Sequence, residues 1–286
     1  MTSARTGSTF LTSHFNDINN VYNAGEFYSM WPIHFYRHIN FLTDNNLNMP
    51  KSFINFMSHL YRVSVSPDIK SVINAHHSEN RKDHAQNLEV SGKFPYTIDL
   101  IHDFIDEIAK LNLEYFINKH ISQVSDYSGW TYNSVIDKAD IVILNYRKSV
   151  LDVWISIQKA NASNQWATKK YDPVYDNRIE WNKNKFLWFY RERYSRYYID
   201  LKKELEETGK PYFVIEYEEL QSKKNTCKYL QERLNAFEID IPLNKPTNIK
   251  QSKNRLFYED CFSNPEEFKS DYHSIKHSTT FTYGLK

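Results

Sequence analysis

Two short apolar runs in the second half of the chain constrain its fold more than any other feature. The first run, Ile141 to Leu144, lies between Asp140 and Asn145, and the second run, Tyr212 to Ile215, follows Pro211. A continuous apolar run of this length is typical of a strand that is buried on both faces of a parallel sheet. The two runs therefore predict two parallel strands in the core of the protein.

Helical patterns separate these two runs. Apolar residues recur at helical spacing after the first run, at Val150, Trp154, Ile157 and Ala160. A longer helix is predicted from Arg178 to Glu207, where Thr208 and Gly209 close it. Because strand and helix alternate, we expect an α/β fold built from βαβ units, with ligands bound at the carboxyl ends of the parallel strands.

The first half of the chain is less regular. Three further helices are predicted from apolar stripes: one through Phe10, Leu11, His14, Phe15 and Ile18, one opened by Pro50 with the face Phe53, Phe56, Met57, Leu60 and Tyr61, and one through Ile98, Ile101, Ile105 and Ile108. The segment from Asn19 to Pro32 is interpreted as a loop with room for a short strand. Beyond Pro242 the tail is expected to be polar and irregular, apart from Arg255 to Phe262.

Length and composition limit the classes of protein to which the chain can belong. The 286 residues suffice for one large domain, so we expect a single domain over residues 1–286. Lys and Arg number 36 against 35 Asp and Glu, a balance that argues against a nucleic-acid partner. No stretch is apolar enough for a membrane span and the chain opens without a signal-peptide pattern, so a cytoplasmic protein is expected.

Neither a disulfide nor a metal site is predicted. The two cysteines, Cys227 and Cys261, have no metal-ligand spacing. His76, His77 and His84 lie in a polar stretch without the helical spacing of a metal motif, and solvated loop histidines are the better interpretation.

A candidate anion-binding loop lies at the start of the chain. Arg5, Thr6, Gly7, Ser8 and Thr9 stand where a loop becomes a helix, and the free N–H groups and dipole of a helix N-terminus suit a phosphate. Gly7 lets the backbone approach the anion closely, and the Ser8 and Thr9 hydroxyls add hydrogen-bond donors. The Arg5 guanidinium can bind two oxygens of a phosphate or sulfate at once. The spacing and lysine of a Walker A loop are absent. A plain helix cap explains the same polar residues without a ligand.

A second candidate site follows the first apolar run. Arg147 and Lys148 stand at the end of the predicted strand, where a parallel sheet presents its ligands. Ser156 lies on the helix that follows and reaches the same anion only if that helix begins beside the strand end. The alternative is a basic pair on the surface and an ordinary helix serine.

The two segments together resemble the sulfotransferase superfamily, whose members use 3′-phosphoadenosine 5′-phosphosulfate (PAPS). The string I-S-I-Q-K-A-N-A-S-N-Q-W, from Ile155 to Trp166, is similar to a segment of the bacterial trehalose-sulfotransferase-like branch. The resemblance implies a P-loop-like three-layer fold with a central parallel sheet flanked by helices. It also implies that residues 5–9 hold the 5′-phosphosulfate and that Arg147, or Lys148 in its place, and Ser156 hold the 3′-phosphate. In the family a strand precedes the loop, whereas only Met1 to Ala4 precede it here.

The resemblance also suggests the general base. The string N-A-G-E-F-Y, from Asn23 to Tyr28, is similar to a segment of the family after its first helix, and it makes Glu26 the candidate base. A carboxylate there takes the acceptor hydroxyl's proton if burial raises its pKa toward the working pH. An exposed loop glutamate is the alternative, and His14 and His34 are substitutes for the base.

The function expected from these residues is transfer of the sulfuryl group of PAPS to a hydroxyl of a small acceptor, a carbohydrate or glycolipid. The family needs no metal, and related enzymes are often homodimers. Two other functions stay open from the sequence. One is a nucleotide-dependent kinase of related fold, and the other is a non-catalytic anion or carbohydrate binder derived from a transferase.

Overall fold

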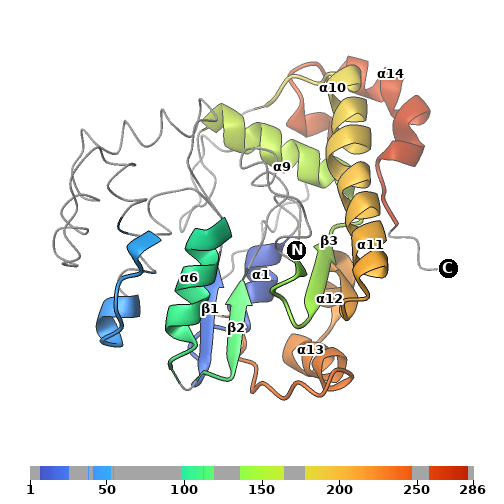
Figure 1. Cartoon of the computed structure of the whole chain (residues 1–286). Coiled ribbons are helices and arrows are strands. Elements are labelled where there is room, and N and C mark those ends of the chain that lie inside the picture. The colour runs from blue at the N-terminus through green and yellow to red at the C-terminus, as the bar shows by residue number, and fades with distance from the viewer. Residues whose placement is uncertain are drawn as a thin grey trace. The chain divides into compact units, whose positions relative to one another are not determined.

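The computed structural model describes residues 7–25, 38, 41–52, 54, 98–111, 113–118, 136–163, 178–246 and 258–282. These residues form a helix-rich α/β structure, and within them lie two small parallel sheets of two strands each (Figure 1). The chain divides into two compact units, one made of residues 1–14 and 139–286 and the other of residues 15–138. A P-loop-like three-layer fold and a single domain both stay predictions.

The sheet of the first unit joins the two apolar runs. β3 (Val142–Tyr146) pairs in parallel with β4 (Tyr212–Glu216), with Val142 opposite Tyr212 and Tyr146 opposite Glu216. The prediction of two parallel strands is confirmed. β3 begins one residue later than the apolar run and continues through Asn145, which is buried although it is polar.

α9 (Val150–Ser163) follows β3 and confirms the helix predicted there. Its Trp154 is among the largest fully buried side chains, and its indole packs edge-on against Trp181 and Phe186. Phe262 and Phe268 complete this cluster from the end of the chain. Rings in edge-on and tilted contact, such as these, build the aromatic core of the first unit.

The long predicted helix is present, but it begins later than Arg178. α10 (Lys183–Trp188), the π-helical segment η2 (Phe189–Ser195) and α11 (Arg196–Thr208) form one continuous column (Figure 1). Gly209 ends it with a φ of 65°, as predicted. The start is wrong because Ile179 pairs with Phe262 as an extended bridge, and the side chain of Asn182 caps the helix by accepting from the backbone N–H of Lys185.

The tail contains more structure than its composition suggested. After β4 come α12 (Tyr217–Ser222) and α13 (Thr226–Asn235), and the tail adds η3 (Tyr258–Cys261), α14 (Pro265–Ile275) and η4 (Lys276–Ser278). The expectation of an irregular tail is therefore wrong. Pro265 at the first turn of α14, followed by Glu266 and Glu267, is a helix start that the sequence already carried.

The second unit holds the other sheet. β1 (Val21–Gly25) pairs in parallel with β2 (Tyr115–Asn118). The segment after Asn19, interpreted as a loop with room for a short strand, therefore contains such a strand. α6 (Ile98–Ile108) confirms the helix predicted over those residues. Helical backbone is also described at residues 51, 52 and 54, which confirms the start of the helix opened by Pro50. The rest of that helix and the three histidines at positions 76, 77 and 84 lie outside the described residues.

The first helix is shorter than its apolar stripe. α1 (Ser8–Ser13) ends where the hydrogen bonds of a turn begin, although Phe15 and Ile18 are buried as the stripe predicted. The backbone after it passes through positive φ at Asp17 and Asn20, values of 56° and 60° that no helix allows. Burial therefore continues past the helix, and a hydrophobic stripe alone placed its end too late.

Candidate functional site

The candidate site lies at the carboxyl edge of the β3–β4 sheet. Arg147 follows the last residue of β3, and Tyr217 and Glu218 follow the last residue of β4. Because the two strands are parallel and in register, their carboxyl ends lie at the same edge, where open α/β sheets bind ligands. The strands thus bring a cation, a phenol and a carboxylate to one place.

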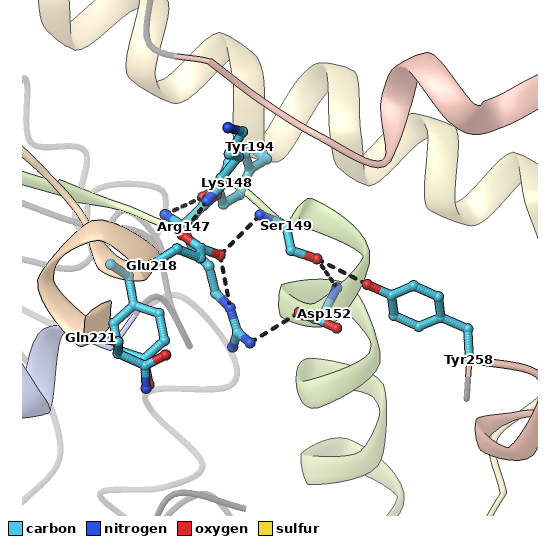
Figure 2. A network of polar contacts seen from close by, with 9 residues as sticks. Arg147, Lys148, Ser149, Asp152, Tyr194, Glu218, Gln221 and Tyr258 are labelled. Carbon is cyan, nitrogen blue, oxygen red and sulfur yellow. Dashed lines mark hydrogen bonds and ion pairs between the residues drawn. The ribbon is translucent and has the colours of Figure 1, made fainter. Parts of the chain in front are cut away.

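Arg147 is surrounded by groups that complement its charge (Figure 2). Its Nη2 donates to Asp152 Oδ2 at 3.1 Å, and its Nε lies 3.5 Å from Glu218 Oε1. Its Cζ stands 5.2 Å from the centroid of the Tyr217 ring, within the range of a cation–π contact. The side chain is 25% exposed, so the guanidinium is reachable from solvent on part of its surface.

Glu218 holds the turn between β3 and α9. Its Oε2 accepts from the backbone N–H of Lys148 at 2.9 Å, and its Oε1 accepts from the backbone N–H of Ser149 at 3.2 Å (Figure 2). A carboxylate on free N–H groups at the start of a helix is favoured by charge-assisted hydrogen bonds and by the helix dipole. The Lys148 side chain itself is exposed.

Ser149 and Tyr258 lie on the other side of this turn. Ser149 Oγ accepts from the backbone N–H of Asp152 at 3.4 Å and lies 3.3 Å from the Tyr258 hydroxyl (Figure 2). Burial raises the pKa of Tyr258, and the Asp152 carboxylate raises it as well while Ser149 lowers it. Tyr258 therefore stays a neutral hydroxyl beside Asp152 at neutral pH.

Two tyrosines of the helical column form hydrogen bonds with the backbone at the end of β3. The Tyr194 hydroxyl accepts from the backbone N–H of Arg147 at 2.9 Å and donates to its carbonyl at 2.5 Å. The Tyr198 hydroxyl donates to the Asn145 carbonyl at 2.8 Å. Tyr194 is fully buried, and burial followed by the neighbouring Tyr198 raises its pKa well above the ordinary value. It remains protonated and can fill both roles, so the backbone of Arg147 is fixed on both of its polar groups.

Gly7 meets this cluster through Tyr217. Its φ of 80° is left-handed, and a Cβ at this position would overlap with the Tyr217 ring. Phe10 of α1 makes an edge-on contact with the same ring, and Gln221 donates to its hydroxyl. Burial raises the pKa of Tyr217, against the opposing effect of Arg147. One tyrosine thus joins the start of the chain to the end of β3.

The predicted site residues fall into three groups. Gly7 and Arg147 come together around Tyr217. Ser8 is buried, Thr9 is exposed, and Ser156 is half-buried on α9. Outside the described residues lie Arg5, Thr6, Glu26, His34 and Trp166.

His14, proposed as a substitute base, is fully buried. Its Nδ1 lies 3.0 and 3.2 Å from the carbonyls of Phe10 and Leu11 and must donate to them, so its Nε2 accepts from the Thr226 hydroxyl at 2.8 Å. Burial lowers its pKa, which favours this neutral form. Both nitrogens are therefore engaged in tying α1 to α13, while Glu26 and its substitute His34 stay predictions.

Sequence reasoning gave no role to several residues of the cluster, among them Asp152, Tyr194, Tyr217 and Glu218. The signal for the last two was present, because they directly follow an apolar run predicted to be a parallel strand. Asp152 and Tyr194 carried no such signal. Their role depends on how α9 and the π segment face β3, which short-range sequence patterns do not specify.

Comparison with known proteins assigns the chain to no family. The chain matches no family model, no curated protein and no solved structure. Within the described part of the chain, no group of His, Cys, Asp and Glu side chains is arranged to hold a metal ion. No helix in that part is long and apolar enough to cross a membrane.

Proposed function

We propose that the chain is a sulfotransferase that moves the sulfuryl group of PAPS to a hydroxyl of a small acceptor, a carbohydrate or glycolipid. One observation carries the proposal. Gly7 and Arg147, which belong to two motifs far apart in the sequence, both contact Tyr217 at the carboxyl edge of a parallel sheet. Two segments that separately have ordinary structural explanations meet at the edge where α/β sheets bind nucleotides.

In the proposed reaction, the two motifs bind the two ends of the donor. The backbone amides of residues 5–9 and the Arg5 side chain bind the 5′-phosphosulfate, and Arg147 with Ser156 binds the 3′-phosphate. The acceptor oxygen attacks sulfur, its proton passes to Glu26, and the bond from sulfur to the phosphate oxygen breaks. Adenosine 3′,5′-bisphosphate then leaves with the electron pair, and donors preorganised around that oxygen stabilise its growing charge.

The donor site is tested by calorimetric titration of adenosine 3′,5′-bisphosphate. Arg147→Ala should weaken binding about tenfold to a hundredfold, the value of a charge-assisted hydrogen bond. Arg233→Ala is the matched control, because Arg233 also stacks on a tyrosine, Tyr229, but on the exposed side of α13. Equal affinity of the two variants would remove Arg147 from the site.

Transfer itself is tested with radiolabelled PAPS and a panel of hydroxyl acceptors, with products identified by mass spectrometry. Arg5→Ala should abolish transfer, and Glu26→Gln should lose turnover while still binding the bisphosphate. Full activity of Arg5→Ala would overturn the assignment. Binding of ATP in preference to PAPS would instead indicate a kinase, and binding of sugars without PAPS would indicate a non-catalytic carbohydrate binder.

A further inference from the structure

The two carboxylates on Arg147 are held in different ways. Glu218 accepts from two backbone amides, those of Lys148 and Ser149, and its contact with the guanidinium is the longer one. Asp152 makes the shorter contact with the guanidinium, at 3.1 Å. Glu218 is thus bound to the backbone of the turn, whereas the carboxylate of Asp152 is bound through side chains, those of Arg147 and Tyr258.

We propose that Asp152 is an internal competitor for Arg147, which yields the guanidinium to an incoming phosphate, and that Glu218 stays in place as a positioning residue. The inference rests on the proposed function, since it concerns how the same arginine meets the 3′-phosphate of the donor. In the unbound protein, one cation faces two carboxylates. An anion that arrived with both still on the arginine would meet a net negative cluster.

Asp152 is the carboxylate that leaves, because Glu218 is also held by two backbone amides. Exposure does not separate the two carboxylates: the Asp152 side chain is 35% exposed and that of Glu218 is 34% exposed, and ion pairs so open to water are weak. A phosphate offers the guanidinium two oxygens in parallel and more charge than a carboxylate, so it wins the exchange. After release, Asp152 stays in the first turn of α9, where the helix dipole favours a negative charge.

Glu218 cannot leave in the same way. Its departure would strip the acceptors from two amide groups at the start of α9, and unpaired amides are costly. The same carboxylate fixes the turn whose first residue is Arg147, and Tyr194 fixes that residue's own N–H and carbonyl. The guanidinium can therefore exchange one partner while its backbone stays still.

The two roles predict changes of opposite sign on the same arginine. We expect D152N to bind inorganic phosphate, inorganic sulfate and adenosine 3′,5′-bisphosphate about threefold more tightly than the unaltered chain, and E218Q to bind them about tenfold more weakly. E219Q is the matched control, because Glu219 is the next residue of α12 and pairs with Lys223 on the surface. Its affinities should not change.

Two further measurements separate these effects from general damage. In an R147Q background D152N should give no gain, which shows that the gain passes through the arginine. The NMR signal of the Arg147 Nε–H group, assigned by its loss in R147Q, should move in E218Q and stay in E219Q. Circular dichroism checks that each variant folds, and Asp152→Ser replaces D152N if the latter does not.

The outcomes distinguish the inference from the proposed function. If D152N binds none of the three probes more tightly, including the case in which no probe binds at all, the inference is overturned. If D152N tightens phosphate and sulfate binding but the bisphosphate binds no better than phosphate, the competitor role stands and the assignment of the nucleotide donor falls.

Discussion

Gly7 and Gly209 share a backbone conformation but differ in their surroundings. Both have a positive φ, 80° and 65°, and both lie beside a helix, Gly7 directly before α1 and Gly209 directly after α11. A Cβ at Gly209 would meet open space, whereas one at Gly7 would overlap with the Tyr217 ring. The pair therefore separates the cost of the left-handed backbone from the cost of lost contact with Tyr217.

Gly7→Ala should destabilise the protein more than Gly209→Ala does. The left-handed backbone costs both variants about 1 kcal/mol, and displacement of the Tyr217 ring costs Gly7→Ala a further 1–3 kcal/mol or so. Denaturant unfolding followed by tryptophan fluorescence measures both free energies. Equal losses in the two variants would mean that the packing of Gly7 on Tyr217 is not tight.

At the scale of elements, the π segment matters because of where it directs one side chain. η2 adds a residue to the helical turn between α10 and α11, and its Tyr194 reaches both polar groups of Arg147. Tyr198, in α11, donates to the carbonyl of Asn145. π segments inside α-helices are frequent at functional sites, and here the segment supports Arg147, the arginine of the candidate anion site.

Tyr194→Phe should therefore cost more stability than Tyr198→Phe. The first leaves the part-buried N–H and carbonyl of Arg147 without this partner, and the second does so for the buried carbonyl of Asn145, at about 1–3 kcal/mol for each group. Thermal unfolding by calorimetry compares the two variants, which remove the same atom from neighbouring turns of one column. A larger loss for Tyr198→Phe would contradict this order.

Elements with a complete local signal could be predicted from the sequence. The runs that form β3 and β4 are apolar on both faces, and Gly209 marks a helix end by its conformation. Residues whose structure depends on distant partners could not be predicted. The bridge between Ile179 and Phe262 delays the start of α10, and the four-residue β2 gains its place only by pairing with β1. Neither partner can be identified from spacing.

The candidate site was predictable to the same extent. Arg147 was found because it ends a recognisable strand, and Gly7 because glycine before a helix suggests a close approach of the backbone. The link between them was not found, because the position of Tyr217 after a predicted strand does not show that its ring packs on Gly7. Asp152 and Glu218 are acidic residues in an expected anion site, a combination that residue type alone argues against.

At the scale of the whole molecule, the first unit is built from two separate pieces of chain. Residues 1–14 belong with residues 139–286, and several contacts join them. The backbone N–H of Asn244 donates to the carbonyl of His14, the Thr226 hydroxyl bonds to the His14 ring, and Phe10 contacts Tyr217. The opening segment is thus part of the packing of α12 and α13.

Deletion of residues 1–14 should loosen one region of the first unit. Without Phe10 and His14, the rings and hydroxyls that they cover become exposed, so amide exchange should accelerate in α12 and α13. Hydrogen–deuterium exchange with mass spectrometry measures this, with α14 as an internal reference because its ring contacts are with other parts of the unit. Uniform acceleration, or none, would argue against the contacts described for the opening segment.

The division of the first unit also sets an order of events during synthesis. A ribosome releases the chain from its first residue at roughly 5–20 residues per second. The whole second unit, a continuous stretch, emerges between the two pieces of the first. Tyr217, the partner of Gly7, emerges later still, on the order of ten seconds or more after it. The opening segment therefore waits as a nascent chain while the second unit is synthesised, and α1 takes its final place only after Tyr217 has emerged.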